Sequence, residues 1–347
     1  MKKFVKRFAS LSLVAILLTG CGAAPAEQKQ QEETVETVEY VEIVGPEVPM
    51  ADPGAKEVSP ARQAAAELGE IASAESPAAM STALVPVASE VKVKKNSRCK
   101  IDYSNVADGY VMVQYTGTTD KRLKAQVKGP TTTYTYDLTA GQWEVFPISD
   151  GNGSYKVSMF KNVSGSKYTV EMTASFAVEL KDEFGPYLYP NQYVNYSVAP
   201  NAVAKAAELV QGKEKPLEKV AAIYDYVVKN LSYDYNKAAT VTSGYLPVLD
   251  SVLEAKRGIC FDYASLMTGM LRSQGVPCKL VIGYAGGAYH AWINVWSEEN
   301  GWVDSAIFFD GTTWQRMDPT FASSSKQSAS VMAYIGDGSN YTVKYLY

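Results

Sequence analysis

Two hydrophobic patterns follow each other along this chain, and each predicts a different kind of structure. Between residues 98 and 181 apolar and polar side chains alternate in short runs, as at residues 110–115 and 134–138, with turn residues between the runs. A period of two is that of a strand with one buried face. About seven such strands in a row are typical of an immunoglobulin-like β-sandwich. We therefore predict an all-β sandwich domain over residues 98–181.

Beyond Gly185-Pro186 the apolar positions recur every three or four residues, which is the period of a helix with one buried face. Residues 201–210 form the first such run. Pro216 opens a second run, which continues to Leu231, and proline is favoured at a first helical position. We expect this second helix to cover the core of an α+β domain over residues 185–347, whose last strand comprises residues 341–347.

A third helical pattern begins at Cys260 and ends before Gly275, and a strand pattern follows over residues 289–296. The thiol would thus lie in the first turn of a helix, where unpaired backbone N–H groups favour the thiolate. His290, the only histidine of the chain, would share its strand face with Trp292. A cysteine nucleophile needs a base beside it, and a histidine on a strand can face a helix N-terminus. The two residues are therefore candidates for nucleophile and base.

Three stretches in this half of the chain carry a resemblance to a known family: GICFDYA around Cys260, HAWINVW around His290 and MDPTF around Asp318. In this order they resemble the transglutaminase-like superfamily of cysteine enzymes, and the resemblance extends from about residue 200 to about residue 345. The Tyr233-Asp234 pair resembles the family as well. The resemblance implies a papain-like α+β catalytic domain with a triad of Cys260, His290 and Asp318.

The third member of this triad has competitors. Asp318 follows His290 by 28 residues (318 − 290), a longer gap than family members often show, and the extra stretch GWVDSAIFFDGTTWQ would form an added hairpin. This stretch contains Asp304 and Asp310. Because an inserted element is a poor source of an essential group, we favour Asp318 and keep Asp304 as the alternative. Asp262 and Tyr263, which follow the cysteine, are interpreted as supporting residues of the fold.

The N-terminus has the pattern of an export signal. Four basic residues precede the apolar run 11–18, which is too short to span a bilayer, so residues 1–20 are predicted to be a signal peptide. The run ends in Leu18-Thr19-Gly20-Cys21, which resembles the lipobox of bacterial lipoproteins. That resemblance implies cleavage before Cys21 and its diacylation, and two acyl chains give lasting membrane anchorage. The alternative is an ordinary secretory signal with an incidental cysteine.

The next segment, residues 21–97, differs in composition from everything after it. Between residues 22 and 90 the chain is rich in Glu, Ala, Pro, Gln and Ser and poor in aromatic residues. Such a segment buries too little apolar area to offset its conformational entropy. We therefore predict a mostly disordered acidic tether, within which residues 60–73 could form a helix.

Charge and cysteine content narrow the function classes. The net charge is −4, and no basic patch indicates binding to nucleic acid. The four cysteines, at positions 21, 99, 260 and 278, show no C-x-x-C spacing, and a single histidine allows only a Cys3His zinc set that would need Cys99 from another domain. We predict no metal site, calcium included, and no cofactor. Cys278 is interpreted as a packing residue.

Tyrosine is unusually abundant, with 24 residues against 10 phenylalanines. Exposed tyrosines of the predicted sandwich could bind a polymer of the cell wall. Tyrosines that pack across neighbouring strands are the favoured interpretation, and the sandwich would then act as a spacer.

Together these features predict a lipid-anchored cysteine enzyme on the extracytoplasmic face of the cell membrane. It would act on an amide bond of a protein or peptide at the cell envelope, such as cell-wall peptide, through a thioester intermediate. Water as the acceptor makes it a protease or amidase, which we favour, and an amine acceptor makes it a transglutaminase. The alternative is a non-catalytic adhesion or scaffold module on the same fold.

Overall fold

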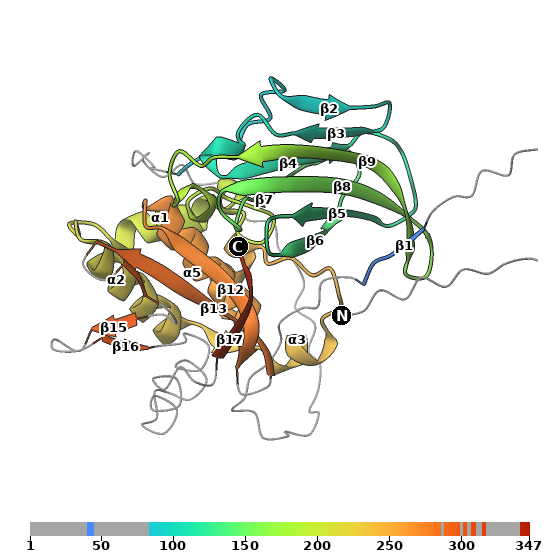
Figure 1. The fold of residues 1–347 in the computed structure, drawn as a ribbon. Coiled ribbons are helices and arrows are strands. Elements are labelled where there is room, and N and C mark those ends of the chain that lie inside the picture. The colour runs from blue at the N-terminus through green and yellow to red at the C-terminus, as the bar shows by residue number, and fades with distance from the viewer. Residues whose placement is uncertain are drawn as a thin grey trace, which may run out of the picture. The chain divides into compact units, whose positions relative to one another are not determined.

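A computed structural model describes residues 40–44, 83–285, 288–298, 301–303, 307–309, 314–316 and 341–347. All of them belong to one compact unit, Glu39–Tyr347. Figure 1 shows two β-sheets and a group of helices with a third sheet beside them. Within the described ranges no helix is both long and apolar enough to cross a membrane.

The two sheets of the first half are antiparallel throughout. One has the order β2-β3-β4-β7, formed by Val93–Lys95, Cys99–Asp102, Tyr110–Tyr115 and Trp143–Pro147. The other has the order β1-β9-β8-β5-β6, formed by Val41–Glu42, Lys167–Val178, Gly153–Ser164, Leu123–Lys128 and Thr133–Leu138. The strands expected at residues 110–115 and 134–138 are thus confirmed as β4 and β6. We call β2 to β9 the two-sheet region; its immunoglobulin-like type stays a prediction.

Tyrosines contribute much of the core of the two-sheet region. Buried side chains from both sheets, such as Val113 and Val157, belong to one hydrophobic cluster. The Tyr136 ring stacks on Phe146 with a centroid separation of 4.0 Å. Other tyrosines of these strands are buried as well, namely Tyr110, Tyr115, Tyr134, Tyr155 and Tyr168. This burial supports packing across strands rather than polymer binding as their role.

The predicted disordered tether, residues 21–97, is wrong at two short stretches. Strand β1 pairs with β9, and the residue directly after it, Ile43, is buried against Phe160 and Tyr168. Strand β2 pairs with β3. Each stretch takes its hydrogen bonds from the edge of a sheet that the rest of the chain builds, so its own composition gives no sign of the pairing. Cys21, the signal peptide and residues 60–73 lie outside the described residues.

The second half combines helices with an antiparallel sheet. Its α-helices are α1 Pro200–Leu209, α2 Pro216–Asn230, α3 Tyr235–Thr240, α4 Leu249–Ala255 and α5 Cys260–Ser273. Its main sheet has the order β14-β13-β12-β17, formed by Gly301–Val303, Ala288–Ser297, Cys278–Ala285 and Tyr341–Leu346. Short pairs are made by β10 Ser232–Tyr233 with β11 Arg257–Gly258, and by β15 Ile307–Phe309 with β16 Trp314–Arg316. Turns of 3₁₀ helix occur at Val106–Asp108, Gly185–Tyr187 and Tyr196–Val198.

Helix α5 is the centre of this half. All of its residues are buried, because α1, α2 and α4 pack around it and β12 and β13 lie against it. Near its C-terminal end Arg272 donates hydrogen bonds to backbone oxygens of Cys278, Tyr189 and Tyr347. Burial lowers the pKa of Arg272 to about 10, so the guanidinium stays charged at neutral pH. These bonds fix the helix to β12 and to the end of β17.

Candidate active site

Cys260 is the first residue of α5, as the sequence pattern predicts. Ile259 before it has an extended backbone and caps the helix. The thiol is fully buried, and the first backbone N–H groups of the helix surround it with partial positive charge. In enzymes that use a cysteine nucleophile the thiolate is the attacking form, and a helix N-terminus is one of the positions at which such cysteines occur.

A network of polar side chains fixes the start of α5. The carboxylate of Asp262, which is 0% exposed, accepts a hydrogen bond from the Ile259 backbone N–H at 2.8 Å. It also accepts one from the Lys237 ammonium at 2.6 Å and one from the Tyr245 hydroxyl. Burial is the main cause that raises the pKa of Tyr245, and the negative charge of Asp262 raises it further. The Tyr245 hydroxyl therefore keeps its proton and remains a donor. Sequence reasoning did not identify Lys237 or Tyr245, because only the fold brings them to Asp262.

We expect Asp262→Ala to lower the free energy of unfolding by about 3 kcal/mol, the cost of removing one partner of a buried ion pair. The change leaves the Ile259 N–H and the Lys237 ammonium without their acceptor. Urea unfolding measures the loss. The matched control is Asp225→Ala, since Asp225 also pairs with a lysine, Lys229 at 2.7 Å, but on the exposed face of α2. The control should cost about 0.5 kcal/mol or less, and equal losses would contradict the role of Asp262.

Gly258 explains why the cysteine motif begins with glycine. A Cβ atom at this position would lie 2.5 Å from Asp262 Cβ, which no real contact allows. Gly258 also lies on β11, and its own backbone carbonyl accepts a hydrogen bond from the Asp234 N–H. Asp234 in turn caps α3 by accepting from the Lys237 N–H. The Tyr233-Asp234 pair and the cysteine motif thus belong to one hydrogen-bonded unit.

His290 lies on β13, in the strand that the alternating pattern predicts. Its side chain is fully buried, and its ring stacks with Trp292 at a centroid distance of 6.2 Å. The residue opposite on β12 is Gly283. A Cβ atom there would lie 2.0 Å from the Thr342 carbonyl oxygen and 2.8 Å from the Trp292 ring. Glycine at this position therefore lets the Thr342 carbonyl of β17 and the ring of Trp292 pack closely against β12.

The structure brings the elements of the two candidates together, since α5 packs against β13. Ala291 and Ile293 of β13 belong to the core around α5, and His290 alternates with them along the strand. Both Asp318 and its competitors, Asp304 and Asp310, lie outside the described residues.

Two other thiols of the chain are unsuited to attack. Burial raises the pKa of Cys99 to about 11 and that of Cys278 to about 12. The Cys278 thiol instead faces the Thr268 hydroxyl of α5 at 3.6 Å. Among the described residues no group of three or more His, Cys, Asp or Glu side chains is arranged to hold a metal ion. Of the three described cysteines, Cys260 is therefore the candidate nucleophile, because it alone is the first residue of a helix.

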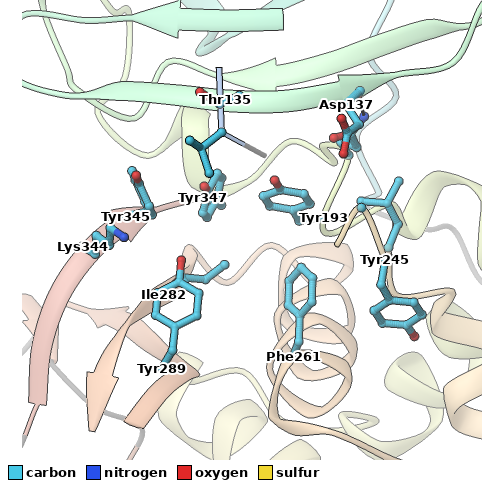
Figure 2. Close-up of a pocket in the computed structure, with 14 residues that line it drawn as sticks. Thr135, Asp137, Tyr193, Tyr245, Phe261, Ile282, Tyr289, Lys344, Tyr345 and Tyr347 are labelled. Atoms are coloured by element: carbon cyan, nitrogen blue, oxygen red, sulfur yellow. Dashed lines mark hydrogen bonds between the residues drawn. The ribbon is translucent and has the colours of Figure 1, made fainter. Parts of the chain in front are cut away.

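A pocket of about 200 Å³ lies beside these elements, between β6 and the α5 side of the main sheet. We call it the tyrosine pocket, after lining residues Tyr193, Tyr245, Tyr289, Tyr345 and Tyr347. Phe261, the neighbour of Cys260, lines it too, and Tyr289 is the neighbour of His290. Figure 2 shows Tyr289 and Phe261 on one side of the cavity and Thr135 and Asp137 of β6 across from them. Sequence reasoning missed this pocket, because its walls come from both halves of the chain.

Comparison with known proteins supports the interpretation of the motifs. Residues 203–319 match the family model described as the Transglutaminase-like superfamily. The chain carries a transglutaminase-like domain. The match includes the positions of Cys260, His290 and Asp318, and it leaves out the two-sheet region.

Curated relatives match between 30% and 52% of this chain. Over 119 residues the chain is 32% identical to the protein-glutamine gamma-glutamyltransferase of Pseudomonas aeruginosa, covering 30% of this chain and 17% of that protein. Over 200 residues it is 23% identical to the protein YebA of Bacillus subtilis, covering 52% of this chain and 27% of that protein. The chain thus spans 17% of the first relative's length and 27% of the second's. The solved periplasmic domain of TgpA from Pseudomonas aeruginosa is 15% identical with a TM-score of 0.32, covering 60% of this chain and 93% of that domain.

Proposed function

We propose that this protein is a cysteine acyl-transfer enzyme that acts on amide bonds of proteins or peptides at the cell envelope. Cys260 attacks the amide carbonyl as its proton passes to His290, and His290 returns the proton to the leaving amine. A thioester of Cys260 results. Asp318 orients the imidazole, and the Cys260 backbone N–H is one donor to the oxyanion.

The observation that carries this proposal is the placement of Cys260 in the transglutaminase-like domain. It is the first residue of the buried helix α5, which packs against the strand of His290. The Asp262 network holds the start of that helix in place. In unliganded enzymes the bond between nucleophile and base is often long and tightens only with substrate, so the approach of His290 is part of the proposal.

The acceptor that resolves the thioester decides between hydrolysis and cross-linking. With water the enzyme is a protease or amidase, and with a lysine-like amine it is a transglutaminase. We favour hydrolysis, because the transglutaminase-like superfamily in bacteria extends beyond cross-linking enzymes. Trapping with Cys260→Ala on cell-wall peptides and surface proteins would identify the substrate.

Alkylation tests the proposal without a known substrate. At pH 7 iodoacetamide should label Cys260 at least about 100-fold faster than Cys278, because the thiolate is the reacting form and Cys278 has a pKa of about 12. Peptide mapping of the native protein by mass spectrometry gives both rates. Equal, slow labelling of the two thiols would identify Cys260 as a packing residue and favour a non-catalytic scaffold.

We propose further that Cys21 carries a diacyl anchor and that the enzyme faces outward from the cell membrane. Cys21→Ser should then move the protein from the membrane fraction to the soluble fraction, because its remaining contacts with lipid are too weak to hold it. Fractionation followed by alkylation of Cys260 measures location and competence together. Persistent membrane association of this variant would contradict the anchor.

A further inference from the structure

Ile259, the residue before the candidate nucleophile, has both of its backbone polar groups fixed. Its N–H donates to the Asp262 carboxylate at 2.8 Å, and its carbonyl accepts from the Tyr263 N–H at 3.1 Å. The described peptide bonds are all trans, so the Cys260 N–H points opposite to the Ile259 carbonyl within one planar unit. That carbonyl faces along α5 toward Tyr263. The Cys260 N–H therefore points out of the helix N-terminus, where the first N–H groups have no partner within the helix.

Asp262 acts on this backbone and not on the thiol. It follows Cys260 by two positions, and side chains two positions apart on a helix do not face each other. Its carboxylate is fully buried and reaches back to the Ile259 N–H. A buried carboxylate loses its water, so it stays charged only where a cation and other donors compensate it. The hold of Asp262 on Ile259 therefore depends on the groups that compensate its charge.

Lys237 supplies that cation. Its ammonium lies 2.6 Å from Asp262 Oδ2, the oxygen that also accepts from the Ile259 N–H. It also donates to the Tyr245 hydroxyl, which in turn donates to the other carboxylate oxygen. The Lys237 side chain is 27% exposed, against 0% for that of Asp262. The charge that holds this buried carboxylate in place thus comes from a side chain at the edge of the network.

Helix α3, which carries Lys237, is itself tied to β11, the strand that leads to α5. The Asp234 N–H donates to the Gly258 carbonyl at 2.9 Å, and the Asp234 carboxylate pairs with Arg257 Nε at 3.2 Å. The same carboxylate accepts from the Lys237 N–H and so caps α3. The backbone of Lys237 therefore has a fixed position beside the residues that precede the nucleophile.

We propose that Lys237 is a positioning residue for the reaction of Cys260. Through the Asp262 carboxylate it fixes Ile259 and thereby the direction of the Cys260 N–H, which is one donor to the oxyanion in the proposed function. An oxyanion donor stabilises the transition state when it already points to the place where the charge develops. The inference rests on the proposed function, and it assigns part of the oxyanion site to a lysine that lies outside the three motifs.

Two reagents that react with the same thiol by different routes test this role. With p-nitrophenyl acetate a carbon–sulfur bond forms through a tetrahedral oxyanion, the ester carbon–oxygen bond breaks as p-nitrophenolate leaves, and the thiol proton passes to His290. Iodoacetamide instead alkylates the thiol as iodide leaves, and no oxyanion forms. In the full chain Lys237→Met should lower the acylation rate about tenfold, less than the roughly 10²- to 10³-fold loss when a donor is removed outright. The alkylation rate should change by less than about twofold, because that step does not use the donor.

The ratio of acylation rate to alkylation rate is the quantity to compare among variants. Peptide mapping by mass spectrometry gives the alkylation rate of Cys260. Release of p-nitrophenolate gives the acylation rate, after subtraction of the release that persists in Cys260→Ala. Lys237→Arg keeps the cation and should restore the ratio. The matched control Lys229→Met removes a lysine that pairs with Asp225 at 2.7 Å on the exposed face of α2, and its ratio should equal that of the unmodified protein.

A second variant decides the question if Lys237→Met does not fold. Tyr245→Phe removes one hydroxyl donor from Asp262 and keeps the ring. It should lower the ratio about threefold, the effect of one neutral hydrogen bond.

An unchanged ratio would overturn the positioning role, whether the two rates fall together or neither changes. Fast alkylation of the unmodified protein would in that case leave the proposed function standing. A Cys260 that is alkylated but never acylated would contradict the acyl transfer on which the inference rests. If Cys260 of the unmodified protein reacts with neither reagent, the proposed function is overturned and this inference with it.

Discussion

Cys260→Ser is expected to lower kcat by about 10⁶-fold, the scale of loss when a serine triad loses its nucleophile. A serine hydroxyl at the same position ionises far less readily than a thiol, and His290 has to activate it in a site built for sulfur. Turnover of an amide substrate found by trapping measures the effect. Cys260→Ala should give the same loss, because neither variant can form a thioester.

The fold should survive both changes. Cys260 is buried, so the alanine variant loses the contacts of one sulfur atom, at a cost of about 1 kcal/mol in the free energy of unfolding. Cys278→Ser is the matched control, since this thiol is equally buried and bonds to Thr268. It should remain active. An inactive but folded Cys278→Ser, with an active Cys260→Ser, would show that the wrong thiol had been assigned.

The second large effect is expected at Asp318. Asp318→Asn should lower kcat by about 10²- to 10⁴-fold, since loss of the orienting carboxylate leaves the imidazole in the wrong tautomer while nucleophile and base remain. Pro319 follows directly and has no backbone N–H to donate to a strand ladder. Turnover of one amide substrate by folded variants measures the loss.

Asp304→Asn is the control for this assignment. Asp304 directly follows β14, the strand that pairs with β13, so it is a competitor by its position in the sequence. It lies in the stretch that we interpret as an insertion, and we expect its loss to change kcat by less than about tenfold. The reverse ranking of the two variants would transfer the orienting role to Asp304.

The local elements of the catalytic half could be predicted from the sequence because their signals are short-range. Helical spacing after Cys260 and alternation around His290 predict α5 and β13, which the structure confirms. Pro216 likewise marks the start of α2. In each case the residues that determine the element lie within about four positions of one another, the reach of helix and strand periodicity.

The pairing of distant segments could not be predicted in this way. Strand β1 forms inside a segment whose composition predicts disorder, because its partners are the edge of β9 and the pair Phe160 and Tyr168. Lys237 and Tyr245 donate hydrogen bonds to the Asp262 carboxylate only because the fold of α3, and of the chain that follows it, brings them there. Neither pairing has a periodic signal, since the contacts join residues far apart in sequence.

The sequence by itself therefore determined the cysteine motif, its helix, the strand of the histidine and the resemblance to the transglutaminase-like superfamily. Only the tertiary structure decided that Cys278 and Cys99 are buried thiols with raised pKa values, because desolvation depends on what packs around a side chain. Only the tertiary structure places β6 beside the catalytic half of the chain. Asp137, Gln192 and Lys344 thereby line one cavity. A cavity is bounded by surfaces from several segments, and no single stretch of sequence contains it.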